Sequence, residues 1–234
     1  MRKLLNALFI LLGILILLIA SGAVFINVRG VPSYEVQAPE VTIDPDSAML
    51  TNGERLVSMV CAECHRGENT NALVGKKVLD IPKEFGEVYS SNITQHPEYG
   101  IGQYTAGELT YLLRTGVKRD GQYIPPYMPR FNNMSDYDMN SVIAYLQSEA
   151  PQVQPEAVET PDSKPSFLVK MLSQFAFLPL PYDGQPVEKP AIEDKLAYGE
   201  YVVHGMVACY ECHSADFKTN NQLNPEQSVV YLGG

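Results

Sequence analysis

The five-residue pattern C-x-x-C-H occurs twice in this chain and constrains its fold more than any other feature. The first copy spans residues 61–65 and the second spans residues 209–213. C-x-x-C-H is the attachment pattern of c-type haem, in which both thiols bond to the porphyrin and the adjacent histidine binds the iron. The sequence therefore predicts two covalently attached haem c groups. The predicted attachment cysteines and axial histidines are Cys61, Cys64 and His65 in the first copy, and Cys209, Cys212 and His213 in the second.

Four cysteines also allow two alternatives, a pair of disulfides in an exported chain or a structural zinc site. Zinc ribbons usually separate their two cysteine pairs by about 15–20 residues, whereas 144 residues lie between Cys64 and Cys209. Each pair is also followed directly by one of the four histidines of the chain, which neither alternative requires. The pattern therefore favours haem over both.

The N-terminal segment is predicted to be a membrane anchor. Residues 4–28 are almost entirely apolar and follow a basic start at Arg2 and Lys3. About 20 apolar residues span a bilayer, whereas the apolar region of a signal peptide runs to about 7–15. We therefore expect an uncleaved signal anchor over residues 1–29, although the small residues at 20–23 would also suit a cleavage site. The basic start places the N-terminus inside, so the protein should cross a bacterial cell membrane once, with its haem domains in the periplasm.

The rest of the chain divides by its proline content. Residues 30–46 contain three prolines and predict an extended tether, which leads into a first domain over residues 47–150. Residues 151–190 contain eight prolines and predict an interdomain linker. Its apolar stretch, residues 167–180, is expected to pack on the domains rather than on the membrane, since only Lys164 and Lys170 offer charge to lipid headgroups. Residues 191–234 are expected to start a second, truncated domain.

Apolar periodicity predicts that the first domain is all-α. A capping-box pattern at Thr51-Asn52-Gly53-Glu54 predicts a helix start, and a second such pattern at Thr105-Ala106-Gly107-Glu108 predicts another helix that Gly116 ends. A third helix is predicted from Ser135. The apolar faces of the three predicted helices are Leu56, Met59 and Val60, then Leu109, Leu112 and Leu113, and finally Met139, Val142, Ile143 and Leu146.

Three methionines compete to be the sixth ligand of the first haem iron. Met139 lies in an apolar helix stripe, so core packing explains it, and Met134 precedes a helix cap, where it could act as a hydrophobic staple. Met128 lies in a proline-fixed turn and has no packing role that explains it. We therefore predict Met128 as the axial ligand. His96, in a loop beside a proline, is a weaker candidate.

The run from Gly53 to Leu146 resembles a class I cytochrome c domain, with a leading helix, C-x-x-C-H, a long loop, a Met-Pro turn and a closing helix. Two further stretches, Ser91–Thr94 with Gly100–Thr105 and Leu113–Val117, are similar to the membrane-associated multihaem cytochrome c subunits of bacterial alcohol, aldehyde and gluconate dehydrogenases. This resemblance implies a dehydrogenase partner that supplies electrons, and quinone or a terminal oxidase that accepts them.

The second copy of the C-x-x-C-H pattern lies in an incomplete repeat of the first domain. Gly199-Glu200-Tyr201-Val202-Val203 echoes Gly53-Glu54-Arg55-Leu56-Val57, which predicts a repeated domain. Asp194 is a plausible helix cap, and the expected buried positions are Leu196, Tyr201 and Val203. No methionine or histidine follows His213, so we expect that the chain is a piece of a longer protein. The alternatives are a high-spin second haem, or an upstream ligand supplied by His204 or Met206.

The resulting prediction is a membrane-tethered dihaem c-type cytochrome that carries electrons from a periplasmic dehydrogenase to the respiratory chain and has no catalytic residues of its own. A dihaem peroxidase that uses the second haem is the alternative, but it requires a distal acid–base group that the sequence does not place. A haem-based sensor ranks last, because no signalling domain is attached. The net charge of −10 argues against binding to nucleic acid, which depends on basic patches.

Overall fold

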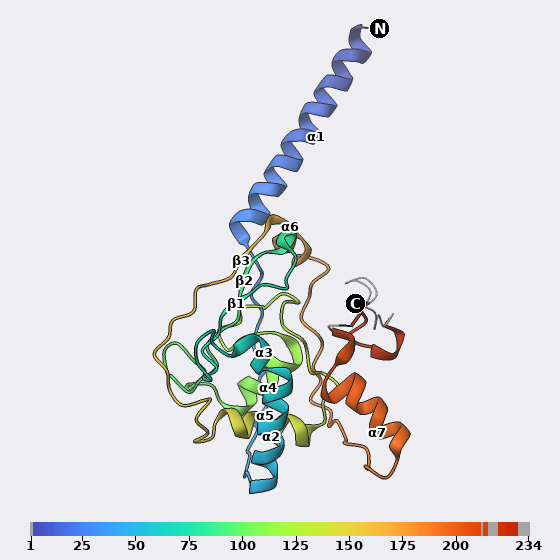
Figure 1. Ribbon diagram of the computed structural model, residues 1–234. Helices are drawn as coiled ribbons and strands as arrows, with labels where there is room; N and C mark the ends of the chain where they lie inside the picture. The colour runs from blue at the N-terminus through green and yellow to red at the C-terminus, as the bar shows by residue number, and fades with distance from the viewer. Residues whose placement is uncertain (1, 212, 215–219, 229–234) are drawn as a thin grey trace.

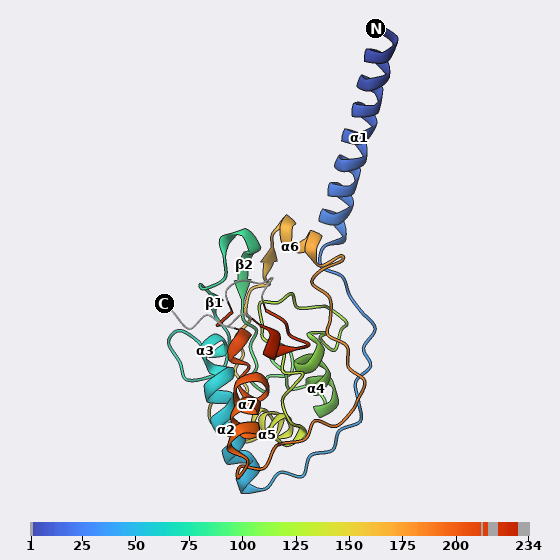
Figure 2. The ribbon, with the colours of Figure 1, turned by 90° about the vertical axis from the view of Figure 1, so that its right-hand side faces the viewer.

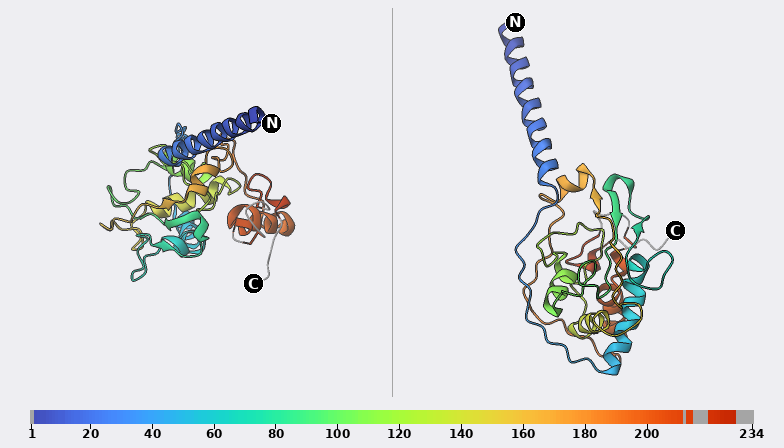
Figure 3. Two further views of the ribbon diagram at one scale, coloured as in Figure 1. Left: turned by 90° about the horizontal axis from the view of Figure 1, so that it is seen from above. Right: turned by 90° about the vertical axis from the view of Figure 1, so that its left-hand side faces the viewer.

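The computed structural model describes residues 2–211, 213–214 and 220–228, and it consists of one long helix that projects from a rounded body (Figure 1). This helix, α1 (Arg2–Arg29), is apolar along its length and has no buried residue. By length and composition it could cross a membrane. The segment that follows runs down the outside of the body to the start of α2 (Figures 2 and 3). There it is held by contacts such as the hydrogen bond of 2.8 Å from the Tyr34 amide to the Gly121 carbonyl.

The body is built on the helices α2 (Ser47–Val60), α3 (Ala62–His65), α4 (Ala106–Thr115) and α5 (Asp136–Leu146). The predicted start of α2 at the Thr51 capping box is wrong. The side chain of Asp46 caps the helix instead, by accepting a hydrogen bond of 2.7 Å from the Met49 amide. Met59 is exposed, so the buried face of α2 is formed by Leu56 and Val57.

The other two helices of the body begin where the sequence predicts. Thr105 and Glu108 form a reciprocal capping box at the start of α4, and Gly116 ends that helix in the left-handed conformation with φ 84°. The side chain of Ser135 caps α5. The core of the body is formed where α5 packs across α2, and all four apolar residues predicted for α5 are buried in it: Met139, Val142, Ile143 and Leu146.

A small antiparallel sheet departs from the all-α prediction. Its strands β1 (Lys77–Val78), β2 (Gly86–Tyr89) and β3 (Lys164–Pro165) lie in the order β1-β2-β3, and the short helix η1 (Lys83–Phe85) connects the first two. Val78 pairs with Val88, and Glu87 pairs with Lys164. The third strand comes from the predicted linker, which therefore lies against the body. The linker continues into α6 (Phe167–Leu172), next to the lower end of α1 (Figure 1).

The last described part of the chain lies to one side of the body (Figure 3). It contains α7 (Lys195–Tyr201), the π-helix η2 (Val202–Met206), and the 3₁₀ helices η3 (Cys209–Glu211) and η4 (Pro225–Gln227). Asp194 caps α7 as predicted. Tyr201 is buried as expected, but Leu196 and Val203 are exposed, so those two burial predictions are wrong. Tyr201 and Met206 of this segment belong to the hydrophobic core of the body, and Tyr198 packs against it.

Candidate functional site

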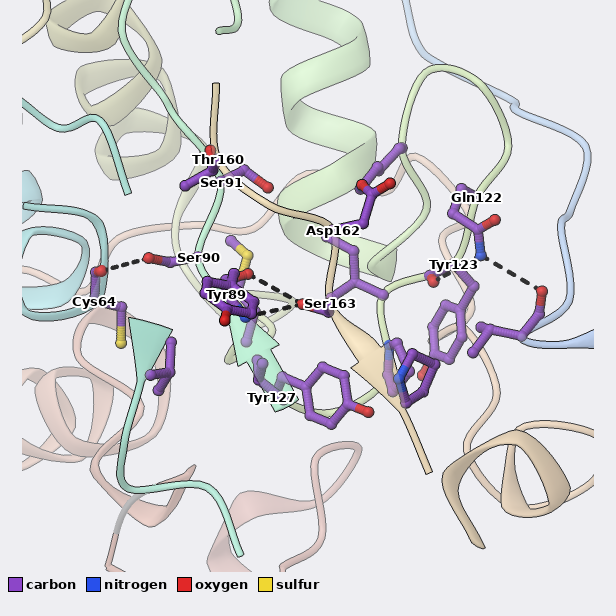
Figure 4. Close-up of a pocket in the computed structure, with 18 of the residues that line it drawn as sticks. Cys64, Tyr89, Ser90, Ser91, Gln122, Tyr123, Tyr127, Thr160, Asp162 and Ser163 are labelled. Carbon is purple, nitrogen blue, oxygen red and sulfur yellow. Dashed lines mark hydrogen bonds between the residues drawn. The ribbon is translucent and has the colours of Figure 1, made fainter. Parts of the chain in front are cut away.

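A cavity of about 570 Å³ lies in the body beside the first C-x-x-C-H segment, within the size range of ligand and cofactor sites. Cys61, Cys64 and His65 line one side, and the turn that contains Met128 lines another. Side chains from the sheet, from residues 122–131 and from the linker complete it (Figure 4). The apolar part of this lining includes Val60, Val78, Val88, Ile124, Pro125 and Phe131. Residues 29–31 also line the cavity, so five segments that are distant in the sequence meet around one space: residues 29–31, 60–65, 78–91, 118–131 and 160–165.

The imidazole of His65 is oriented by a backbone carbonyl. Its Nδ1 lies 2.7 Å from the carbonyl oxygen of Ser91. Because a carbonyl oxygen can only accept a hydrogen bond, Nδ1 carries the hydrogen and Nε2 keeps its lone pair. Burial lowers the pKa of His65 and outweighs the opposing effect of the Ser91 hydrogen bond. A neutral ring with one nitrogen engaged by a carbonyl is the usual state of a metal-binding histidine.

The Ser90–Thr94 segment fixes the position of that carbonyl. The Ser90 hydroxyl donates a hydrogen bond of 2.6 Å to the Cys64 carbonyl (Figure 4). The buried Asn92 side chain donates to the carbonyls of Glu156 and Val158 at 3.0 and 2.9 Å. The segment therefore connects the C-x-x-C-H helix to the linker. Sequence reasoning noted this stretch for its resemblance but did not assign Ser91 a role.

The Cys61 side chain is buried. Burial, and to a smaller extent the neighbouring Cys64, raises the pKa of the Cys61 thiol to about 12, so Cys61 is not a thiolate at neutral pH. Among the described residues, no three His, Cys, Asp or Glu side chains gather as a metal site. Cys61 and Cys209 are thiols rather than partners in a disulfide. These observations favour neither the zinc alternative nor a disulfide through either residue.

The three candidate methionines differ in position. Met128 is half-buried and lines the cavity. Met134 and Met139 are almost fully buried in the core and do not line it. The Nδ1 of His96 accepts hydrogen bonds from two backbone amides of its own loop, and its ring stacks on Tyr99 at 5.1 Å; it does not line the cavity either. The structure thus brings Met128 together with the first C-x-x-C-H segment.

Two buried arginines that the sequence did not single out support the Met128 turn. Arg130 donates hydrogen bonds to the carbonyls of Met128, Ile124 and Pro125. Arg114 donates to the carbonyls of Phe131, Asn132 and Met134 at 2.7–2.9 Å. The sequence signals that could have identified them are their positions. Arg114 lies between Leu113 and Thr115 on an otherwise apolar helix face, and Arg130 directly follows the Met128-Pro129 pair.

The lining of the cavity fits a haem group. Apolar side chains form part of the walls, together with polar ones such as Tyr127 and Ser163, and two cysteines lie at one side. The neutral imidazole uses Nδ1 for its hydrogen bond and leaves Nε2 without one to any described residue. The thioether of Met128 supplies a second soft ligand of the type that pairs with histidine on haem iron. The supporting hydrogen bonds to Ser91 and Met128 make this an organised site.

The second C-x-x-C-H segment has no comparable surroundings in the described part of the chain. Cys209 is half-buried, His213 is exposed, and Cys212 lies outside the described residues. A second cavity, of about 380 Å³, touches His204 but neither Cys209 nor His213. Met206 is buried in the core. Among the residues that the structure describes, no second ligand set therefore gathers around Cys209 and His213.

Comparison with known proteins gives a match to the family model "Cytochrome c" over residues 50–150. The chain is 32% identical over 177 residues to the cytochrome c subunit of alcohol dehydrogenase (quinone) from Gluconobacter oxydans, covering 73% of this chain and 36% of that protein. It is 30% identical over 200 residues to the gluconate 2-dehydrogenase cytochrome c subunit of Pantoea cypripedii, covering 81% and 44%.

A third relative is a "Diheme cytochrome c-type" protein of Cereibacter sphaeroides, with 26% identity over 214 residues that cover 84% of this chain and 69% of that protein. The chain spans little more than a third of the alcohol dehydrogenase subunit. The comparisons give the peroxidase alternative no support.

Proposed function

Because residues 50–150 form a cytochrome c domain and the relatives include cytochrome c subunits of dehydrogenases, we propose that this chain is a membrane-tethered dihaem electron-transfer subunit. It would take electrons from a periplasmic dehydrogenase and pass them to the respiratory chain. The observation that carries the proposal is the cavity in which His65, oriented by Ser91, and Met128, supported by Arg130, lie together with Cys61 and Cys64.

The first domain would hold its haem through thioethers to Cys61 and Cys64, with His65 and Met128 as axial ligands. When bound, haem supplies a one-electron couple, and Met/His ligation places its potential at the higher end of the range for haem proteins. The protein contributes rigidity: carbonyl contacts fix the imidazole and the methionine turn, so both ligands stay in place when the charge of the site changes. The second haem would be attached at Cys209 and Cys212, with His213 as its axial ligand.

The membrane part of the proposal rests on α1, an exposed apolar helix of 28 residues. It would leave the N-terminus inside and the cytochrome domain on the periplasmic side of a bacterial membrane. This orientation is consistent with the basic residues before the helix.

The test is expression of the full chain with haem attachment, followed by two measurements. Haem content against polypeptide should give two haems per chain, and the Cys209→Ser/Cys212→Ser variant should give one. In bacterial membranes that contain quinone-dependent alcohol, sugar or sugar-acid dehydrogenases, addition of the matching substrate should reduce the bound haem. A chain that ascorbate reduces, but that no dehydrogenase and substrate pair reduces, would refute the proposed role.

A further inference from the structure

We propose that α6 and the turn after it form a second, peripheral contact with the lipid bilayer, beside the span proposed for α1. This proposal rests on the proposed membrane tether. The contact surface, termed here the juxtamembrane patch, consists of four side chains: Phe167, Leu168, Phe175 and Leu178. Their exposed fractions are 44%, 38%, 64% and 47%.

The position of α6 relative to α1 places the patch at the membrane interface. The Nζ of Lys170 donates a hydrogen bond of 2.9 Å to the side-chain oxygen of Asn27. The Nε2 of Gln174 donates a bond of the same length to the Gly30 carbonyl. Asn27 lies within the last turn of α1, about 3 Å from its end at a rise of 1.5 Å per residue. Figures 1 and 2 show α6 beside the lower end of α1, which is where the proposed span would leave the bilayer.

The opposite side of the same segment is fixed to the body. Val169 and Ser173 are fully buried, and the Ser166 amide donates a hydrogen bond of 3.0 Å to the Phe85 carbonyl. The ring of Phe177 packs edge-on against Phe85, with centroids 6.2 Å apart. The segment thus packs on the domain as its sequence predicts, but it uses only part of its apolar surface to do so. The four patch residues are left outside this contact.

The charges around the patch suit anionic headgroups. The last turn of α1 together with η1, β3 and α6 carries four basic residues and one acidic residue, in a chain whose net charge is −10. The basic residues are Arg29, Lys83, Lys164 and Lys170, and the acidic residue is Glu84. Glu87 of the neighbouring strand β2 adds a second carboxylate, 3.8 Å from Lys164 Nζ. Aromatic and aliphatic side chains flanked by lysines are typical of surfaces that insert about 5–10 Å into the headgroup region. The elements around the patch therefore supply more basic side chains than Lys164 and Lys170 alone.

The consequence concerns the orientation of the cytochrome domain. One helix crossing a bilayer leaves the attached body free to tilt, whereas a second contact fixes its angle. Arg29 and Gly30 also line the haem cavity. A bilayer held against the patch would therefore keep that cavity close to the membrane surface.

The experiment is photo-crosslinking of the haem-loaded full chain in nanodiscs of phosphatidylethanolamine and phosphatidylglycerol that carry a diazirine on the acyl chain. Peptide mass spectrometry should find lipid adducts both in residues 4–28 and in residues 167–178. The Phe175→Ser/Leu178→Ser variant should lose the second set and keep the first. Leu196→Ser, at an exposed leucine of α7 that lies outside the patch, is the control and should keep both.

The outcomes separate this inference from the tether. Adducts in residues 4–28 without any in 167–178 refute the patch and leave the tether intact, as would be found if another protein or a second copy of the chain covers it. Adducts at 167–178 that persist in the double variant also refute the patch, because the contact would not depend on its side chains. Absence of adducts in both segments refutes the tether itself. Haem content of each variant verifies that it is folded.

Discussion

The Tyr201 hydroxyl donates a hydrogen bond of 2.6 Å to Oδ2 of Asp138, which joins α7 to α5 of the cytochrome domain. The Asp138 side chain is fully buried. Its other oxygen accepts hydrogen bonds from the side-chain Nδ2 of Asn52 at 2.7 Å and from Lys189 Nζ at 2.8 Å. One carboxylate therefore connects α2, α5, the linker and α7. Each of these partners helps to stabilise the buried carboxylate, because removing a charge from water without hydrogen bonds costs free energy.

Tyr201→Phe should lower the free energy of unfolding by about 1.5–3 kcal/mol, the range for hydrogen bonds to charged groups. The ring and its packing remain, so the loss reports the hydroxyl alone. Urea titration of the full chain in detergent, followed by circular dichroism, measures it. Tyr198→Phe on the same helix is the control and should change stability by less than about 0.5 kcal/mol. Equal effects of the two substitutions would show that Asp138 does not depend on Tyr201.

The stabilisation that Asp138 provides should be lost in acid. Burial alone would raise the pKa of Asp138, but hydrogen bonds from Lys189, Tyr201 and Asn52 outweigh it and hold the pKa below its ordinary value. The unfolded chain then binds the proton more readily, so the stabilisation is present above about pH 4 and is lost as pH falls through the lower, folded pKa.

The measurement is the difference in unfolding free energy between the wild type and Asp138→Asn from about pH 7 to about pH 3. This difference should shrink as the pH falls. Asp44→Asn, which makes the same chemical change on the exposed extended segment, is the control. A difference between wild type and Asp138→Asn that is constant over this range would contradict the assigned pKa shift.

Met128→Ala should remove the weak far-red charge-transfer band of a methionine-to-ferric-haem bond and lower the reduction potential, because Met/His ligation raises it. Met134→Ala is the control. It should destabilise the fold by about 2–5 kcal/mol, as for other core methionines, but should keep the band. Absorption spectra of the oxidised full chain distinguish the two cases. A band that survives in Met128→Ala would reassign the ligand.

Local signals predicted the elements that depend on nearby residues. The capping box at Thr105 and the stripe from Met139 to Leu146 are short-range patterns, and the structure confirms both. The small sheet could not be predicted this way, because β2 pairs with Lys164 and Pro165, more than seventy residues later in the chain. The spacing of Met59 predicts that it lies on the buried face of α2, but its side chain is exposed.

The same difference between short-range and long-range signals separates the candidate ligands of the site from the residues that orient them. The C-x-x-C-H pattern and the proline-fixed turn identified Cys61, Cys64, His65 and Met128 as candidates, and the structure brings these four residues to one cavity. The residues that orient them could not be found by pattern. Ser91 acts through its backbone carbonyl, which any residue type would supply. The buried charge of Arg130 is stabilised by several backbone carbonyls that come together only in the folded chain.

Arg130→Lys should loosen the Met128 turn without removing the positive charge. A lysine cannot donate to three carbonyls in a planar fork, so some buried acceptors lose their partners, at about 1–3 kcal/mol each. We expect the far-red band to disappear at a lower urea concentration than in the wild type, before global unfolding. Arg119→Lys, a matched substitution at the surface, should leave the two transitions unchanged. Coincident loss of the band and of helicity in Arg130→Lys would rule out a local role.

Gly53 and Gly199 occupy equivalent places in the repeated Gly-Glu pattern but differ in their surroundings. A Cβ at Gly53 would lie 2.0 Å from the Ser141 carbonyl oxygen, where α2 crosses α5, whereas a Cβ at Gly199 meets nothing within 4 Å. Gly53→Ala should therefore force the two helices apart, at a cost of about 1–3 kcal/mol or more. Gly199→Ala should instead stabilise α7 by about 0.5–1 kcal/mol, because alanine favours a helix over glycine. Urea titration of both variants should show changes of opposite sign in the free energy of unfolding. A destabilising Gly199→Ala would mean that another surface packs against that face of α7.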